Sequence, residues 1–274
     1  MSYEHFFGLT EQPFSNAPES RFFYESRQHS EALVRIMHSI NTMKGLSIMM
    51  GDIGCGKTLL ARKLLETLEE DPKFEAALMV IVHSEITAEW LLRKLAMQLG
   101  VENPGDKKAI ILPQLYERLM QIYEEGRKAA VIIDEANMLV SREIFEEFRG
   151  LLNLEAPGHK LLSITLTGLP ELEKNIALDP PLQQRIALKF TLKSLNEEEV
   201  AEYIKHRINI VGCEADIFTP NAYRLIYQYS KGIPRLINTI CDNGLLESFL
   251  IKKNIVDEEI IDEVGRNLDL EKIG

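Results

Sequence analysis

The sequence contains few cysteines and no long apolar run. Its 274 residues include only three cysteines, Cys55, Cys213 and Cys241, which lie far apart without the spacing of metal ligands. This pattern indicates a reducing compartment without structural disulfides. The longest apolar runs, such as Ala76–Val82 and Leu161–Leu166, are much shorter than the roughly 20 residues of a membrane-spanning helix. We therefore expect no transmembrane segment.

The sequence also lacks an excess of basic residues. Its formal net charge of −11 at pH 7 argues against a protein that coats nucleic acid, although a local basic patch is compatible with this charge. No basic region followed by a continuous apolar segment begins the chain, so no signal peptide is evident. With 45% hydrophobic and 27% charged residues, the composition is typical of a soluble globular protein, which we expect in the cytoplasm.

Short apolar segments alternate with amphipathic segments over the first two thirds of the sequence. The expected strands are Leu46–Met50, Ala76–Val82, Ala129–Ile133, Leu161–Thr167 and Ile186–Leu192. The expected helices are Lys57–Glu70, Thr87–Leu99, Lys108–Glu125 and Leu139–Leu152. This alternation predicts an α/β fold with a parallel five-stranded sheet that is flanked by helices on both faces.

The pattern changes to helix alone after Lys193. Asn196 precedes the segment EEEVAEYIKHRINIVG, whose first turn is acidic, and Thr219 with Pro220 begins a second helix. The segments GIPRLINTICDNGLLESFLIKKN and VDEEIIDEVGRNL predict two more helices. We therefore expect two domains, an α/β domain over residues 1–193 and an all-helical domain over residues 194–274.

The segment SIMMGDIGCGKTLLARKLL combines an apolar strand, a glycine-rich turn and a helix. Its Gly51-x-x-x-x-Gly56-Lys57-Thr58 pattern is typical of a phosphate-binding loop, or P-loop. The glycines allow backbone N–H groups to face inward, and the helix N-terminus adds partial positive charge at the same place. Lys57 is expected to contact the outer phosphates of a nucleotide, and the Thr58 hydroxyl to bind Mg²⁺. The alternative is a glycine-rich surface turn, which would not require the strand before it and the helix after it.

The complete set of expected nucleotide contacts is Gly51, Asp52, Ile53, Gly54, Cys55, Gly56, Lys57, Thr58 and Leu59. The segment AAVIIDEAN adds two carboxylates at the end of an apolar strand. Asp134 would hold Mg²⁺ through its water shell, and Glu135 would orient and polarise the attacking water. Alternatively, the two carboxylates form only a helix-capping turn. Beside a P-loop, the catalytic interpretation is favoured, because ligand sites in α/β sheets lie at the carboxyl ends of the strands.

The P-loop, the Asp-Glu pair and the helical C-terminal region together resemble the AAA+ ATPases, a group of P-loop NTPases whose helical domain is called a lid. The N-terminal segment YEHFFGLTEQPFSNAPESRFFYESRQHSEAL resembles, more narrowly, the ATPase domain of general secretion pathway protein A and its relatives. These relatives include pilus-associated ATPases and a group close to transposition helpers. The segments LTGLPEL, LQQRI and GIPRLIN also match the pattern of this group.

The resemblance implies three further functional residues. Thr167 would be the sensor 1 residue that contacts the γ-phosphate or the attacking water. Arg185 would be an arginine finger for the ATP of a neighbouring subunit, and Arg235 would be the sensor 2 residue of the lid. A permanently charged guanidinium suits both arginine roles. The alternatives are a structural threonine at a strand end and two arginines without a part in catalysis.

Aromatic residues are frequent near the N-terminus, where the sequence contains Phe6, Phe7, Phe14, Phe22, Phe23 and Tyr24. These residues are too apolar for a mobile tail, so we expect them to pack on the ATPase core or on the next subunit.

Three classes of function fit the sequence. The first is an Mg²⁺-dependent ATPase that forms a homo-oligomer with ATP and acts on a protein partner in a bacterial secretion or pilus system, free in the cytoplasm or at the inner face of the membrane. The second is a DNA-associated ATPase that resembles transposition helpers, and the third is a slow nucleotide-dependent switch. Residues 194–274 contain nine basic and fifteen acidic residues, which disfavours DNA as the partner. General secretion pathway protein A continues into a membrane helix and a wall-binding domain that are not in this sequence, so we expect either a region of a longer protein or a free-standing relative.

Overall fold

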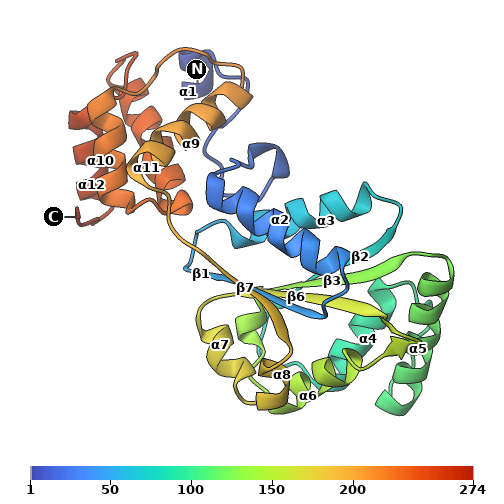
Figure 1. Cartoon of the computed structure of the whole chain (residues 1–274). Helices are drawn as coiled ribbons and strands as arrows, with labels where there is room; N and C mark the ends of the chain where they lie inside the picture. Colours follow the sequence, from blue (N-terminus) through green and yellow to red (C-terminus); the bar gives the residue numbers. More distant parts are fainter. Residues whose placement is uncertain (1, 274) are drawn as a thin grey trace. The chain divides into compact units, whose positions relative to one another are not determined.

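The computed structural model describes residues 2–273, whose contacts divide into two compact units (Figure 1). The first, called the sheet unit, comprises residues 27–53 and 57–192. The second, called the helical unit, comprises residues 2–26, 54–56 and 193–273. None of the described helices is long and apolar enough to cross a membrane.

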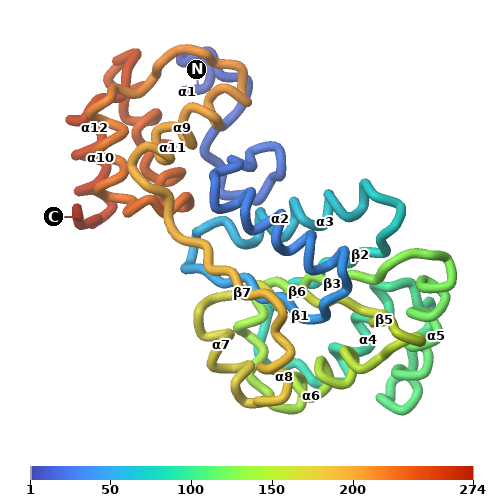
Figure 2. The backbone as a smooth tube through the Cα atoms, viewed as in Figure 1, coloured from blue at the N-terminus to red at the C-terminus, as the bar shows by residue number. Residues whose placement is uncertain are grey.

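The sheet unit contains a five-stranded parallel sheet, as predicted. Its strands are β1 (Leu46–Gly51), β2 (Phe74–Val80), β3 (Lys128–Asp134), β6 (Leu162–Gly168) and β7 (Ile186–Leu192). The strand order is β2-β3-β6-β1-β7, and every pair is parallel. The neighbouring strands β6, β1 and β7 can be followed in the backbone trace of Figure 2.

Helices cover both faces of this sheet. The long ones are α2 (Arg27–Asn41), α3 (Lys57–Glu69), α4 (Ala88–Gln98), α5 (Lys108–Glu124) and α6 (Arg142–Leu151). Figure 1 shows α2 and α3 on one face and α4, α5 and α6 on the other. Shorter elements are η2 (Ala136–Met138), α7 (Glu171–Ile176), α8 (Pro180–Gln183) and the hairpin of β4 (Glu155–Ala156) and β5 (His159–Lys160).

Burial explains why the apolar runs of the sequence form the central strands. Every residue of β1 and β6 is buried, and β3 is buried from its second residue onward. Strands that are covered on both faces have continuous apolar runs rather than alternating ones. The edge strand β7, by contrast, alternates between partly buried and exposed residues until its last residue, Leu192, which is buried.

The helical unit contains the four helices that were expected after residue 193. They are α9 (Glu197–Ile210), α10 (Pro220–Ser230), α11 (Pro234–Leu250) and α12 (Glu258–Asn267). Asn196 and Glu199 form a reciprocal capping box at the start of α9, and the Thr219 side chain accepts the N–H of Ala222 at the start of α10. These side chains satisfy N–H groups that have no partner within the helix.

The N-terminal segment packs in the helical unit, which differs from its expected place in the α/β domain 1–193. It contains the short helix α1 (Tyr3–Phe7) and the 3-10 turn η1 (Ser20–Phe22). Phe14 and Phe22 are each 2% exposed and belong to the same apolar cluster as Phe218. The rings of Phe14 and Phe218 meet edge to face with centroids 6.1 Å apart. The reason is that the C-terminal helices leave an apolar core that these aromatic rings complete.

Buried Arg207 holds this segment against α9. Its Nε donates a hydrogen bond of 2.6 Å to the carbonyl of Pro13, and its Nη2 donates one of 2.9 Å to that of Ser15. Its Nη1 donates to the Tyr203 hydroxyl at 2.8 Å, and its guanidinium lies 4.5 Å from the centroid of the Phe22 ring. Arg207 is only 4% exposed, so its charge is compensated by these acceptors and rings rather than by water.

We predict that Arg207→Ala loosens the N-terminal segment. The substitution removes the donor from two backbone carbonyls and a hydroxyl, so the free energy of unfolding should fall by roughly 3 kcal/mol. Urea denaturation and the rate of proteolysis within residues 2–26 measure the effect. Arg266→Ala is the control, because the Arg266 side chain is 72% exposed and, among residues 2–273, pairs only with Asp262. Equal stability of the two variants would contradict the prediction.

Candidate nucleotide-binding site

The candidate site lies at the carboxyl edge of the sheet, where β1, β3 and β6 end. β6 lies between β1 and β3 and pairs with both. Its register places Thr167 opposite Met49 of β1 and places Leu166 opposite Ile133 of β3. Thr167 is therefore a neighbour of both the strand that precedes the P-loop and the strand that ends at Asp134.

The P-loop connects β1 to α3, and Lys57, Thr58 and Leu59 form the first turn of this helix. Gly54 and Gly56 have positive φ angles of 83° and 93°, a backbone conformation that residues with a side chain rarely adopt. The Lys57 ammonium donates hydrogen bonds of 2.9 Å to the carbonyls of Gly51 and Asp52. No acidic side chain lies in the first turn of α3, so no carboxylate of this turn competes for its partial positive charge.

The remaining loop residues differ in exposure. Asp52 is exposed, Ile53 is 64% exposed, and Cys55 is 1% exposed. A reactive thiol in this place would need access to solvent. Cys55 is therefore best explained as a small residue that fits the loop.

Arg235 contacts the tip of the P-loop within the helical unit. Its backbone N–H donates to the carbonyl of Gly54 at 3.4 Å. A Cβ on Gly54 would lie 2.9 Å from the Ile233 side chain and 2.9 Å from the Arg235 Cβ, closer than real Cβ contacts. The loop tip and the start of α11 therefore approach so closely that only glycine fits at position 54.

Asp134 and Thr167 form the buried centre of the candidate site. Asp134 is 1% exposed and Thr167 is fully buried. The Thr167 hydroxyl donates a short hydrogen bond to Asp134 Oδ1. Asp134 Oδ2 is buried and accepts no hydrogen bond from the described residues. A buried carboxylate oxygen without a partner is costly, so this oxygen is suited to a ligand such as the water shell of a cation.

The donors fit a magnesium ion that is bound together with a nucleotide. Mg²⁺ prefers oxygen ligands, keeps several waters and is usually held by one or two protein oxygens plus phosphates. The Thr58 hydroxyl and Asp134 supply such oxygens. Among residues 2–273, no group of three His, Cys, Asp or Glu residues could hold a metal ion by itself.

Glu135 follows Asp134 in a strained conformation. Its φ and ψ of 55° and 32° are left-handed, which costs a residue other than glycine roughly 1–2 kcal/mol. The residue precedes η2, but its side chain makes no capping hydrogen bond there. The absence of this bond argues against the helix-capping alternative. The partly buried Glu135 carboxylate is therefore available for a contact with a ligand.

Arg185 lies at the opposite edge of the sheet. It directly precedes β7, and the start of a parallel strand lies at the amino edge, about 20 Å from the carboxyl edge in a strand of this length. Its Nη1 donates to Asn153 Oδ1 at 2.5 Å and to the carbonyl of Arg149 at 3.4 Å. Arg185 is therefore partly buried and held by its own chain. The sequence offered no local pattern for Asn153, because the contact joins residues 32 positions apart.

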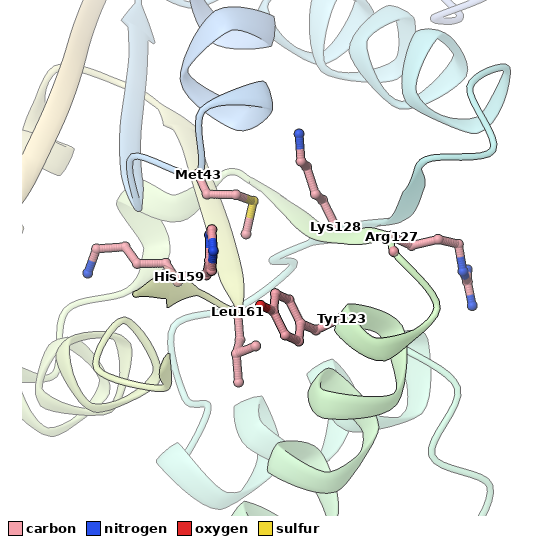
Figure 3. A pocket seen from close by; sticks show the side chains of 8 residues that line it. Met43, Tyr123, Arg127, Lys128, His159 and Leu161 are labelled. Atoms are coloured by element: carbon pink, nitrogen blue, oxygen red, sulfur yellow. The ribbon is translucent and has the colours of Figure 1, made fainter. Parts of the chain in front are cut away.

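A cavity of about 240 Å³ also lies at the amino edge (Figure 3). It is lined by Met43, Tyr123, Gly126, Arg127, Lys128, His159, Lys160 and Leu161. Figure 3 shows Arg127 turned away from the other labelled side chains, and it pairs with Glu75 and Glu125. Because Lys128 begins β3 and Asp134 ends it, this cavity is no part of the nucleotide site.

The parallel sheet, the P-loop and the buried Asp134 define a P-loop NTPase. Residues 40–176 match the protein family that is described as AAA domain. The chain therefore belongs to the AAA domain family, the AAA+ ATPases.

Two curated proteins illustrate this relationship. The chain is 34% identical over 252 residues to General secretion pathway protein A of Aeromonas hydrophila, a match that covers 90% of this chain and 45% of the relative. It is 25% identical over 209 residues to an ORC1-type DNA replication protein of Cenarchaeum symbiosum (strain A), which covers 70% of this chain and 49% of the relative. The chain thus spans about half the length of the curated relatives it matches.

Solved structures show the same fold. The ORC2 protein of Aeropyrum pernix in its ADPNP-ADP complexes has a TM-score of 0.70 at 16% identity, over 96% of this chain and 73% of that chain. The RuvB Holliday junction branch migration motor of Thermotoga maritima has a TM-score of 0.60 at 15% identity, over 88% of this chain and 70% of that chain. These similarities bear out the predicted fold class.

We predict different effects on stability for the replacement of two buried threonines of β6. Thr167→Val removes the donor to a buried carboxylate and should lower the free energy of unfolding by about 1–3 kcal/mol. Thr165→Val is the matched control, because the Thr165 hydroxyl is buried without a hydrogen-bond partner among the described residues. This control should leave stability unchanged or raise it by up to about 1 kcal/mol. Urea denaturation without nucleotide measures both, and an equal loss would show that the bond to Asp134 contributes nothing specific.

Proposed function

We propose that this protein hydrolyses ATP to ADP and phosphate with Mg²⁺. The observation that carries the proposal is the buried Asp134, which accepts from Thr167 and whose second oxygen has no hydrogen-bond partner among residues 2–273. Lys57 and the loop N–H groups would bind the phosphates, and Asp134 and Thr58 would hold the cation. When bound, Mg²⁺ neutralises charge on the phosphate oxygens. Glu135 would orient the attacking water, and Thr167 would contact the γ-phosphate or that water.

Two arginines would complete the reaction cycle. Arg235 would sense the nucleotide, a role that its contact with Gly54 at the loop tip supports. Arg185 would act on the ATP of a neighbouring subunit in a head-to-tail homo-oligomer that forms with ATP. Its position at the amino edge supports this role, because Arg185 is too far from the carboxyl edge to reach a nucleotide that is bound to its own subunit.

The biological role that we propose is that of a motor or assembly factor for a bacterial secretion or pilus-type envelope system. The 34% identity to General secretion pathway protein A supports this role. The protein would act in the cytoplasm, free or at the inner face of the membrane through a protein partner. A turnover rate that is too slow to drive work would favour a nucleotide-dependent switch instead.

Two substitutions should separate ATP binding from hydrolysis. Lys57→Ala should weaken ATP binding at least roughly tenfold, because it removes a charged donor to the phosphates. Glu135→Gln should bind ATP normally but lower kcat by about 10²–10⁴-fold, because it loses the group that polarises water. Nucleotide titration and phosphate release measure the two effects.

Each of these two substitutions has a matched control. Lys63 lies on the same helix as Lys57 and pairs with Glu66 at the surface, so Lys63→Ala should leave both parameters unchanged. Glu143 is exposed in the first turn of α6, and Glu143→Gln should likewise be neutral. Normal turnover by Glu135→Gln would overturn its catalytic assignment.

Mixing two inactive variants tests the role of Arg185. Arg185→Ala should bind ATP but lose about 10³–10⁵-fold in rate if the arginine stabilises charge on the transferred phosphoryl group. Glu135→Gln still carries Arg185, so it can donate this residue to an adjacent Arg185→Ala subunit that has its own Glu135. Mixtures should therefore recover activity, with a maximum at an intermediate ratio. No recovery, with co-assembly shown by size analysis, would exclude action across subunits.

A DNA-associated ATPase is the second candidate. The similarity to an ORC1-type DNA replication protein favours it, whereas the net charge of −11 disfavours it. We expect labelled duplex DNA to bind no better than roughly 10⁻⁴–10⁻⁶ M at moderate salt, with or without an ATP analogue. Nanomolar affinity that strengthens as salt falls would establish the second candidate in place of the first.

A further inference from the structure

Two segments of the sheet unit meet beside the candidate catalytic centre. The first runs from Asp134 through η2, and the second continues from β6 through Leu169 toward α7. η2 packs against both β6 and α7. Neither segment belongs to the P-loop, and the proposed function uses only three of their residues, Asp134, Glu135 and Thr167.

Asn137, two residues after Glu135 in the chain, connects these segments. Its side-chain Oδ1 accepts the backbone N–H of Leu169 at 2.9 Å. The Thr167 hydroxyl makes the other cross-link, to Asp134. Glu135 thus lies between two side-chain hydrogen bonds, one at the residue before it and one two residues after it.

Gly168 shows how closely the segments approach. A Cβ at this position would lie 2.7 Å from Asn137 Oδ1 and 2.9 Å from the Asn137 backbone nitrogen. Real Cβ atoms essentially never make such contacts. The approach therefore requires glycine, and it leaves the Asn137 amide no room to move toward β6.

This arrangement constrains the backbone of Glu135 from both ends. Its left-handed conformation is strained, and strained residues keep their conformation only where the surroundings hold them. On one side, strand pairing and Thr167 hold Asp134. On the other side, the bond between Asn137 and Leu169 holds η2.

We infer that Asn137 is a positioning residue for ATP hydrolysis, which holds the Glu135 carboxylate in the orientation that activates water. This inference rests on the proposed function and adds a residue to it. Asn137 does not touch the nucleotide in this role. Its loss should therefore lower kcat while leaving the affinity for nucleotide unchanged.

Asn137→Ala tests the inference directly. Because a displacement of about 1 Å in a reacting group can cost on the order of 10²-fold, kcat should fall by roughly 10–10²-fold. The Kd for ATP should stay within about twofold of the wild-type value, since no binding contact is lost. Asn137→Asp keeps an oxygen acceptor for the Leu169 N–H and should restore most of the turnover.

Asn175→Ala is the matched control for a purely structural contribution. The Asn175 side chain donates to the Asn137 backbone carbonyl at 2.9 Å, so this variant removes a second bond to the same turn but keeps the one to Leu169. It should retain the wild-type kcat. Gly168→Ala displaces the Asn137 amide without removing it and should reproduce the loss of kcat. This variant tests the positioning role of Asn137 if Asn137→Ala does not fold.

The outcomes separate this inference from the proposed function. If wild-type protein hydrolyses ATP and Glu135→Gln does not, the proposed function stands. The inference is then overturned if Asn137→Ala keeps its kcat, if Asn137→Asp is as slow as Asn137→Ala, or if Asn175→Ala is equally slow. If wild-type protein and Glu135→Gln have equal activity, the proposed function itself fails, and the inference falls with it.

Discussion

The position of β6 between β1 and β3 is the constraint on which the candidate site depends. Parallel strands all end at one edge, but only adjacent strands place side chains within hydrogen-bond distance. Because β6 is adjacent to both, Thr167 can donate to Asp134 while its strand also pairs with the strand of the P-loop. The chemistry of the site therefore follows from strand order as much as from the motifs.

Burial of the Asp134 carboxylate lowers the stability of the fold but leaves an oxygen that can bind a ligand. A buried charge costs several kcal/mol unless acceptors and donors compensate it, and a single threonine donor compensates only one of the two Asp134 oxygens. The left-handed Glu135 adds backbone strain at the next residue. Such local violations are typical of functional sites, because a ligand or a reaction uses them. Arg207 shows the contrasting case, since each nitrogen of this buried guanidinium donates a hydrogen bond and the charge holds two segments together.

Local sequence patterns were sufficient to predict most secondary structure, but they did not predict contacts between distant segments. The apolar runs predicted all five strands of the sheet, and the capping residues Asn196 and Thr219 predicted helix starts in the helical unit. The helix Arg27–Asn41 and the two-residue strands of the hairpin were missed, because the former is mostly polar and the latter are too short for periodicity. The aromatic residues near the N-terminus predicted that this segment is buried, but they did not predict that it packs in the helical unit. At the site, the P-loop was predictable because its spacing is local, whereas the contact of Asn137 with Gly168 depends on the register of β6.

We propose that Asp134 holds a magnesium ion together with ATP, and the decisive measurement is the magnesium dependence of ATP affinity. The measurement titrates a fluorescent ATP analogue into wild-type protein and into Asp134→Asn, each with Mg²⁺ and with a chelator. Asparagine keeps the acceptor for Thr167 but places an amide at the second oxygen. If Asp134 holds the ion, Mg²⁺ should tighten binding to the wild-type protein and no longer do so in the variant, while the affinity without Mg²⁺ should be the same for both. An equal response of both proteins to Mg²⁺ would show that Asp134 does not hold the ion.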